Sequence, residues 1–256
     1  MTMSISISLI TVCRNNSDTI AESLASVNAQ TYENLQYIVV DGCSTDGTCE
    51  IIRKQGVRVS QLISEEDNGI YDAINKGLSM AQGDVIGLLH ADDMLAHASV
   101  LEDVARGFQT SDCDALYGDL VYVNRTDANQ VVRYWKSGVY VQDMFRKGWM
   151  PPHPTFYIKK EWIERYGAYD LRFRTSADYE FMLRMVHKHG AKLHYIPEVM
   201  VKMRVGGQSN ENIGNRLRAN REDRMAWRVN GLRPGPLTLI RKPLSKLRQF
   251  LLRGTS

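Results

Sequence analysis

Two adjacent carboxylates end an apolar stretch of the sequence, GDVIGLLHADDML over residues 83–95. Asp92 and Asp93 follow residues that predict a buried strand, where neighbouring side chains point to opposite faces. An unpaired carboxylate in the interior is very unfavourable. Either the strand ends before these acids, or a positive group lies on them. Carboxylate oxygens suit Mg²⁺ or Mn²⁺; the alternative is capping of a helix that begins near Ala96.

Carboxylates follow two other predicted strands as well. Asp41 comes directly after the apolar run LQYIVV, and the acidic run EED, residues 65–67, comes after VSQLIS. A single such position could be chance, because acids favour helix N-termini. Three strand ends that meet at the ligand-binding edge of a parallel sheet are better explained by a shared divalent cation.

Strands and helices alternate over the first 110 residues. Strands are predicted at residues 6–12, 35–42, 59–67 and 84–93, and helices at residues 17–30, 44–55 and 69–83. This alternation indicates βαβ units around a mainly parallel sheet that is buried on both faces. The sequence therefore predicts an α/β protein with a Rossmann-like, nucleotide-binding first half.

The pattern changes after residue 110. Antiparallel strands are predicted at residues 115–124 and 130–138, a further strand at 153–160, a helix at 176–190 and an extended segment at 192–207. We expect one continuous domain over residues 1–210, with a nucleotide-binding half at 1–110 and a variable half at 111–210. A basic helical tail would follow at residues 211–256.

Composition is that of an ordinary globular protein, with 256 residues, 43% apolar and 24% charged. The four cysteines show no CxxC spacing, which favours reduced thiols in a cytosolic protein. The N-terminus lacks the basic region of a signal peptide, and no apolar run approaches the roughly 20 residues that span a bilayer. We expect a cytoplasmic protein.

The net charge of +3 conceals an asymmetry. Residues 204–256 hold 12 Lys/Arg against 3 Asp/Glu, whereas residues 1–203 hold 20 against 26. A basic tail on an acidic body indicates an anionic partner. The amphipathic run RKPLSKLRQFLLRG, residues 241–254, predicts a helix that lies on the inner face of an anionic membrane, or one that packs on the body. Nucleic acid is not predicted, because the tail has too few aromatic residues.

Four segments carry a resemblance to a known family: SLITVCRN, IVVDGCSTDGT, SEEDNGIYDAINKGLSMAQGD and LLHADD. They resemble the donor-binding half of family 2 glycosyltransferases, which are inverting enzymes of GT-A fold, and most of all the bacterial exopolysaccharide and glycolipid branch. The match is dense over residues 4–95 and thinner to about residue 210. Four motifs in the family's order are specific. The resemblance implies transfer of a sugar from a nucleotide-sugar donor to a hydroxyl of a surface polysaccharide, lipid-linked oligosaccharide or glycolipid.

The resemblance implies a set of donor contacts at the strand ends: Thr11, Arg14, Asp41, Asp67 and Asp92. Thr11 and Asp41 would contact the base and ribose. Asp93 together with Asp92 would bind the divalent cation, Mn²⁺ or Mg²⁺, on the diphosphate. Many members carry another acid two residues before Asp92, where this chain has His90. This difference leaves open which of the two aspartates is the main metal ligand.

The second half of the chain would supply the catalytic base. The segment TSADYEF aligns with the family's motif at the start of a helix and makes Asp178 the candidate. Inversion needs a carboxylate within hydrogen-bond reach of the attacking hydroxyl. Many relatives carry an acid immediately before this base, and this chain has Ala177 there. The alternative is a first-turn aspartate favoured by the helix dipole.

Two further segments resemble parts of the family's active site. WMPPHPTFY suggests that His153, Trp149 and Phe156 form an acceptor-side floor, because sugars present apolar faces to aromatic rings; the alternative is a rigid Pro-rich turn with core aromatics. RVGGQSN, residues 204–210, resembles a mobile loop over the pyrophosphate, where Arg204 would neutralise developing charge. A solvated turn is the alternative.

Two rival functions remain open at this level. A sugar-nucleotidyltransferase would also join a Rossmann-like half to metal chemistry, but the segment TVCRNNSD after the first strand has no glycine. A non-catalytic, transferase-like binding protein is encouraged by His90 and Ala177. A dehydrogenase is unsupported, because no GxGxxG follows a predicted strand.

Overall fold

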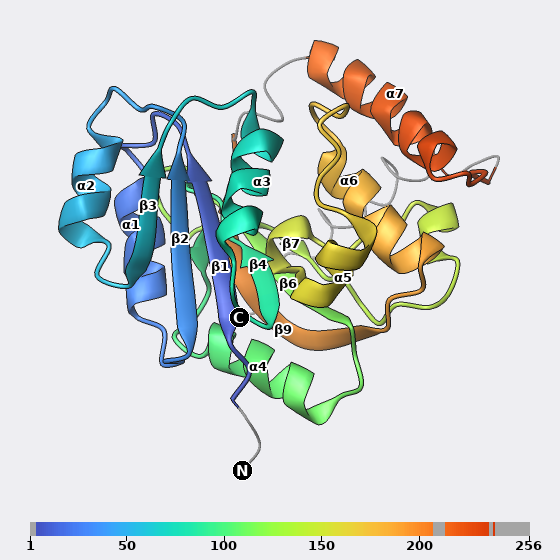
Figure 1. Cartoon of the computed structure of the whole chain (residues 1–256), viewed down its shortest axis with the longest axis horizontal. Helices are drawn as coiled ribbons and strands as arrows, with labels where there is room; N and C mark the ends of the chain where they lie inside the picture. Colours follow the sequence, from blue (N-terminus) through green and yellow to red (C-terminus); the bar gives the residue numbers. More distant parts are fainter. Residues whose placement is uncertain (1–3, 207–212, 236–237, 239–256) are drawn as a thin grey trace.

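The computed structural model describes residues 4–206, 213–235 and 238. The described residues form one mixed sheet in the order β3-β2-β1-β4-β8-β6-β9-β5, with β7 paired to β6 (Figure 1). Its strands are β1 (Ile7–Cys13), β2 (Leu35–Asp41), β3 (Val59–Ser64), β4 (Val85–Leu88), β5 (Met94–Leu95), β6 (Ala115–Val123), β7 (Val131–Trp135), β8 (Tyr157–Lys159) and β9 (Leu193–Arg204).

Helices cover the sheet and its ends. They are α1 (Ile20–Asn28), α2 (Thr48–Gln55), α3 (Ile70–Met80), α4 (Val100–Thr110), α5 (Lys160–Tyr166), α6 (Ala177–Met182) and α7 (Ile213–Val229), with the shorter η1 (Met144–Lys147), η2 (His153–Thr155) and the π-helical η3 (Leu183–Lys188). In the part of the chain that the structure describes, none of these helices has the length and apolar content to span a bilayer.

The alternation of side chains along β1 supplies two separate cores. Leu9 points to the layer of α1, α2 and α4, whereas Ile10 points to α3 on the other face. Each such buried side chain contributes about 1.5–3 kcal/mol of hydrophobic free energy. Helix α3 approaches β1 so closely that a Cβ at Gly77 would lie 2.5 Å from Cγ2 of Ile10. A side chain at that position would push α3 off the sheet.

The first four strands are parallel, as predicted. β1 lies between β2 and β4, and β2 also pairs with β3 in parallel. The sheet then continues into the second half of the chain through antiparallel pairing of β4 with β8, where Ile86 lies opposite Ile158. The predicted α/β architecture with a mixed sheet is confirmed, and residues far apart in the sequence share one sheet.

Three elements differ from the prediction. The strand expected at residues 84–93 ends at Leu88, because the chain turns where the Asp93 N–H donates to the carbonyl of His90. The strand expected at 153–160 is confined to β8, since prolines in the preceding segment cannot donate to a ladder. The helix expected at 176–190 is divided between α6 and η3.

Candidate active site

Asp41 lies at the carboxyl end of β2, opposite Cys13 of β1 and Ser64 of β3. Its carboxylate accepts hydrogen bonds from the Ser44 N–H at 2.9 Å, the Ser44 hydroxyl and the Ser64 hydroxyl at 2.7 Å. Burial by itself would raise the pKa of Asp41, but these hydrogen bonds outweigh burial and lower it. Asp41 is therefore a fixed negative charge, and a ligand would reach it only by displacing these serines, because the residue is fully buried.

Asp67 and Arg14 converge beside Asp41. A Cβ at Gly42 would lie 2.2 Å from Oδ2 of Asp67 and 3.3 Å from Cδ of Arg14. Glycine is thus required at position 42 for the two side chains to meet there. Asp67 in turn accepts a hydrogen bond at 2.9 Å from the Gly69 N–H, just before α3. The structure brings Arg14, Asp41 and Asp67 together at the ends of β1, β2 and β3, which we call the strand-end rim.

Thr11 does not belong to this rim. It lies two residues inside the end of β1, has no exposed surface, and its hydroxyl forms a 3.0 Å hydrogen bond with the Tyr37 hydroxyl. A donor could not contact Thr11 without opening the sheet. We therefore exclude Thr11 from the donor contacts that the resemblance implies.

The two aspartates after β4 have different surroundings. Asp93 is fully buried; its Oδ1 accepts the Arg204 N–H at 3.3 Å, and its Oδ2 has no hydrogen-bond partner among the described residues. Burial, together with the nearby charge of Asp92, raises the pKa of Asp93 well above its usual range. Asp92 is only half-buried. The strand has ended before both acids, and Asp92 is the one that solvent can reach.

Arg204 is a buried clamp, and its role in neutralising charge on the pyrophosphate stays a prediction. Its guanidinium donates to the carbonyls of Asp92 at 3.0 Å and Arg125 at 3.1 Å, and pairs with Glu22 at 2.5 Å. Only 4% of the side chain is exposed. Arg204 therefore holds the turn that carries Asp92 against the end of β9. The loop at residues 207–210 lies outside the described residues.

Asp178 stands in the first turn of α6 and is half-buried. Its Oδ1 accepts a hydrogen bond at 3.3 Å from the hydroxyl of Tyr71 on α3. Burial, reinforced by the Asp178 charge, raises the pKa of Tyr71, so this hydroxyl stays a hydrogen-bond donor. A carboxylate held by one neutral donor, and still partly exposed, can accept a proton.

The start of α6 is held by a carboxylate from α7. Glu222 accepts hydrogen bonds from the backbone N–H groups of Arg174, Thr175 and Ser176 at 3.2, 2.8 and 2.9 Å. It also accepts the Thr175 hydroxyl at 2.9 Å. These N–H groups precede the helix that carries Asp178. Glu222 therefore fixes the segment leading to the candidate base through backbone contacts.

A polar and aromatic network joins Asp178 to the turn with Asp92. His153 bonds the Tyr169 hydroxyl at 2.7 Å through Nε2, and its ring centroid lies 5.8 Å from that of His90. Burial lowers the pKa of His153 to about 4. Burial also lowers the pKa of His90, although the charges of Asp92 and Asp178 both oppose that shift. Because His90 stands two residues before Asp92, these contacts lead from Asp178 to the turn that carries Asp92.

The aromatic residues expected at the acceptor side divide into two groups. Trp149 is half-buried; its Nε1 donates to the Ser137 carbonyl at 2.9 Å, and its ring packs on Tyr140 at 5.2 Å between centroids. Phe156 is 4% exposed and lies in the core beside Ile158. The core interpretation applies to Phe156, so we exclude it from the acceptor surface.

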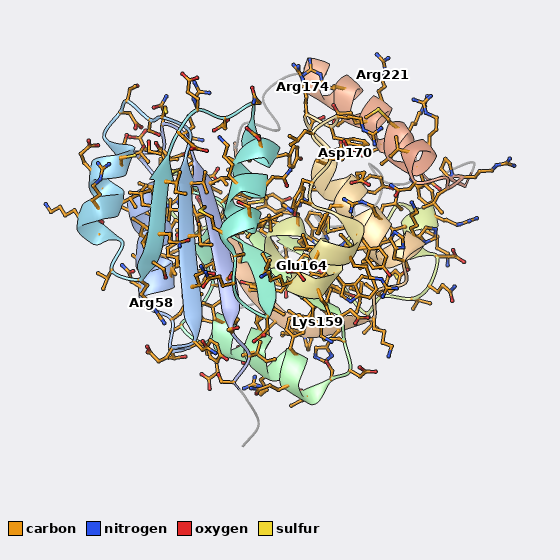
Figure 2. All side chains as sticks on the ribbon, in the orientation of Figure 1. Arg58, Lys159, Glu164, Asp170, Arg174 and Arg221 are labelled. Atoms are coloured by element: carbon orange, nitrogen blue, oxygen red, sulfur yellow. The ribbon has the colours of Figure 1, made fainter. Side chains whose placement is uncertain are left out.

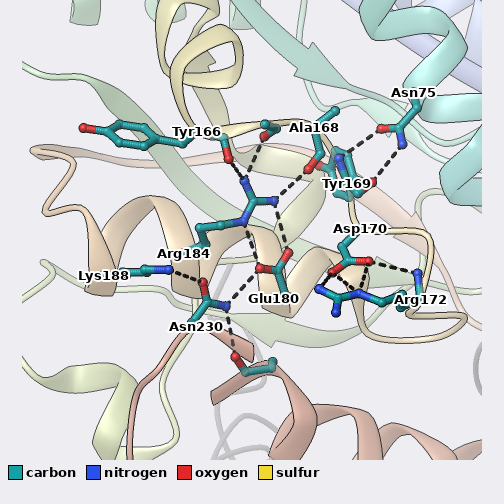
Figure 3. Close-up of polar contacts among 12 residues, drawn as sticks. Asn75, Tyr166, Ala168, Tyr169, Asp170, Arg172, Glu180, Arg184, Lys188 and Asn230 are labelled. Carbon is teal, nitrogen blue, oxygen red and sulfur yellow. Dashed lines mark hydrogen bonds and ion pairs between the residues drawn. The ribbon is translucent and has the colours of Figure 1, made fainter. Parts of the chain in front are cut away.

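A second set of contacts anchors α6 and η3 (Figure 3). The Arg184 guanidinium lies between the Glu180 carboxylate, at 2.9 Å, and the carbonyls of Tyr166 and Ala168. The Asn230 amide donates to Glu180 at 2.9 Å. Glu180 is therefore satisfied inside the protein and leaves Asp178 as the acidic group of this helix that faces the site.

Three possible metal ligands also meet elsewhere among the described residues. Ligand atoms of His97, Asp103 and Glu198 lie within 4.8 Å of one another. Asp103 is already paired with Arg106, and the group includes neither of the aspartates expected to bind metal. At the turn after β4, the chain offers the Asp92 carboxylate, and a cation there would take its other ligands from diphosphate and water.

Sequence reasoning missed two positioning residues. Tyr71 stands inside the motif GIYDA, but no local feature shows that its hydroxyl reaches a residue on α6. Glu222 reads as one charge of a basic helix, and its capping role depends on the packing of α7. The position of Tyr71 in a family motif could have pointed to its role. The sequence contains no comparable signal for Glu222.

The arrangement of the sheet defines a class of proteins, the GT-A type transferases. The structure of Staphylococcus aureus TarS 1–349 in complex with UDP-GlcNAc superposes with a TM-score of 0.67 at 16% identity, covering 88% of this chain and 65% of that one. Mannosyltransferase PcManGT from Pyrobaculum calidifontis, in complex with GDP-Man and Mn²⁺, superposes with a TM-score of 0.67 at 18% identity, covering 99% of this chain and 71% of that one. The chain spans 39% of the longer TarS chain.

Sequence comparison identifies the family. The profile of Glycosyl transferase family 2 matches residues 8–173. A PGL/p-HBAD biosynthesis glycosyltransferase of Mycobacterium bovis is 27% identical over 194 residues, covering 73% of this chain and 72% of the relative. The chain belongs to glycosyltransferase family 2.

Proposed function

We propose that this glycosyltransferase is an inverting, metal-dependent enzyme. It moves a sugar from a nucleotide-sugar donor to a hydroxyl of a surface polysaccharide, lipid-linked oligosaccharide or glycolipid at the cytoplasmic face of the membrane. The relatives support the donor class, since TarS is seen with UDP-GlcNAc and PcManGT with GDP-Man and Mn²⁺.

One observation carries the proposal: a continuous chain of contacts leads from Asp178 to His90, which stands two residues before Asp92. The two carboxylates come from distant parts of the sequence, and this chain of contacts supports their assignment to one site. One carboxylate would serve the leaving diphosphate and the other the attacking hydroxyl, as an inverting displacement requires. The chain of contacts runs from Asp178 through Tyr71, Tyr169 and His153.

The residues present fit a divalent cation at Asp92. A hard, half-exposed carboxylate suits Mn²⁺ or Mg²⁺, which keep waters and share their coordination with phosphates. Asp93 is buried, so it would support the turn that carries Asp92 by its position. A bound cation would stabilise negative charge on the leaving diphosphate. The nucleotide side of the same rim would be formed by Arg14, Asp41 and Asp67.

Asp178 would act as the general base. It takes the proton of the acceptor hydroxyl while that oxygen attacks the anomeric carbon and the bond to the diphosphate breaks. The nucleoside diphosphate leaves with the bonding electron pair on its oxygen. Tyr71 donates to Asp178 and holds the carboxylate toward the site. Trp149 and His153 would bound the acceptor side.

A thermal-shift screen tests the proposal. UDP, GDP and their sugar conjugates are added with Mn²⁺, with Mg²⁺ or with EDTA. A ligand that binds the folded state raises the midpoint by mass action, and we expect one nucleotide to do so only with metal. The chosen donor is then incubated with and without acceptor lipid extract. Release of pyrophosphate from a nucleoside triphosphate, with no release of nucleoside diphosphate from a nucleotide sugar, would overturn the proposal in favour of a nucleotidyltransferase.

A further inference from the structure

An arginine-lined cleft opens beside the segment that precedes α6, outside the strand-end rim. Its volume is about 670 Å³, and Glu222 and Met225 form part of its wall. Six arginines line the rest: Arg172, Arg174, Arg218, Arg221, Arg224 and Arg228. We call this feature the arginine cleft. Figure 2 shows Arg221 on α7 and Arg174 beside the same helix.

The spacing of the α7 arginines places them on one stripe of the helix. Positions 218, 221, 224 and 228 recur at intervals of three and four residues, which share one helical face. All four are exposed, whereas Ala226 and Trp227 on the other side are fully buried against the body. Like charges at these spacings destabilise an isolated helix. Packing of α7 against the body requires only the buried face of the helix. Packing therefore does not explain why four arginines share the exposed face.

The protein supplies little counter-charge inside the arginine cleft. Arg172 pairs with Asp170 at 2.5 Å. Among the described residues, the other five arginines form no ion pair within 4.0 Å. The one carboxylate in the wall, Glu222, is 8% exposed and is occupied by backbone N–H groups of residues 174–176. The cleft therefore presents a strong positive potential to a ligand.

The position of the arginine cleft connects it to the reaction. Arg174 is four residues before Asp178, and Glu222 joins the cleft wall to the start of α6. A ligand held by these arginines would lie next to the candidate base. The strand-end rim, by contrast, is built from β1, β2 and β3 of the first half of the chain. The donor diphosphate and the cleft ligand would thus occupy separate places.

We propose that the arginine cleft binds a phosphate or pyrophosphate group of the acceptor. This inference rests on the proposed function and names the chemical class of its acceptor: a sugar or lipid that carries phosphate. Planar guanidinium groups bind phosphate oxygens through paired hydrogen bonds. Several of them around one cleft select a doubly charged group over a single carboxylate. Binding there holds the acceptor while its hydroxyl reaches Asp178.

The first experiment measures phosphate binding without any sugar transfer. Inorganic pyrophosphate is titrated by calorimetry into the full chain already saturated with the nucleoside diphosphate that stabilises it. We expect the double variant Arg221→Gln/Arg224→Gln to bind pyrophosphate at least tenfold more weakly, because it removes two guanidinium groups. The control Arg53→Gln/Arg106→Gln removes two exposed arginines from α2 and α4 and retains the affinity. Equal affinity of both variants overturns the proposal.

The second experiment separates two sources of the same phosphate chemistry. A short, soluble prenyl diphosphate is compared with vesicles of phosphatidylglycerol in phosphatidylcholine. The proposal expects the double variant to lose affinity for the prenyl diphosphate and to raise the KM of a phosphate-bearing acceptor, with the donor KM unchanged. The proposal is overturned if the protein binds the vesicles but not the prenyl diphosphate, and if the double variant loses vesicle binding. The arginine stripe would then be a membrane contact. Pyrophosphate binding is measured without any transfer reaction. The proposal for the arginine cleft can therefore fail while the proposed transfer activity is found, or hold while that activity is not found.

Discussion

The strand-end rim and the surroundings of Asp178 are held in different ways. At the rim, Asp41 is bonded by Ser44 and Ser64 and Asp67 by Gly69, so partners stand 2 to 23 residues away. Asp178 depends on Tyr71, 107 residues before it, and its helix depends on Glu222, 46–48 residues after the N–H groups it binds. These bonds lie within the first half of the chain, so substitutions in the second half should disturb the rim little. The position of Asp178 depends on how α3, α6 and α7 pack against one another.

The largest expected effect concerns the base itself. Asp178→Asn keeps the shape and the Tyr71 contact but cannot take a proton, so transfer should fall by about 10²- to 10⁴-fold. Donor affinity should stay the same, since the rim is separate. Turnover of labelled donor and calorimetric donor binding are measured, with the exposed Asp127→Asn as control. Near-normal turnover by Asp178→Asn would remove this residue from the reaction.

Asp92→Asn should give the next largest effect. The half-exposed carboxylate is the proposed ligand, so metal-dependent donor affinity should fall by about tenfold or more. Asp93→Asn should change that affinity less, because its side chain is buried. Donor titrations with Mn²⁺ and with EDTA compare the two. If Asp93→Asn caused the larger loss of metal-dependent donor affinity, Asp93 and not Asp92 would be the main metal ligand.

Glu222→Gln tests the long-range support of the base. It replaces a charged acceptor of three backbone N–H groups by a neutral one, and we expect a loss of about 2 kcal/mol in the free energy of unfolding. Turnover should fall while the donor KM is kept, because α6 is loosened and the rim is not. Urea denaturation and kinetics are measured beside Glu33→Gln, whose side chain is 92% exposed. Equal behaviour of both variants contradicts the positioning role.

Asp93 makes stability depend on pH in a known direction. Its pKa is raised in the folded state, so the folded protein binds the proton more tightly than the unfolded chain. The free energy of unfolding is then lost as pH rises from about 4, the unfolded value, toward the folded pKa, by up to about 1.4 kcal/mol per pH unit. Asp93→Asn should remove this slope. Urea midpoints at several pH values provide the measurement, and an unchanged slope would assign it to other groups.

The smallest effect is expected at Thr11. Thr11→Val removes the hydrogen bond to Tyr37 and should cost about 1 kcal/mol of unfolding free energy. Donor affinity should not change, because Thr11 lies inside the sheet. Thermal unfolding and donor titration are sufficient. A loss of donor affinity at unchanged stability would return Thr11 to the site.

The first half of the fold was predictable because its signals are local. Strands expected at residues 35–42 and 59–67 are found at Leu35–Asp41 and Val59–Ser64, since each apolar or alternating run ends in a short polar turn. Strand β2 is mostly buried, whereas β3 is partly exposed at the edge of the sheet. The strand expected at 153–160 is found only at Tyr157–Lys159, where β8 pairs with β4 and β6, because prolines in the preceding segment cannot donate to a ladder.

The sequence by itself determined the α/β order, the acids after the strands and the family to which the chain belongs. The first two follow from hydrophobic periodicity and from turns that span a few residues, and the family follows from the resemblance of four motifs. The tertiary structure decided that Arg204 is a buried clamp, that Phe156 is core, that Tyr71 bonds Asp178, and that six arginines line one cleft. Burial and partner choice depend on which surfaces meet after the chain folds, and residue types alone do not specify that.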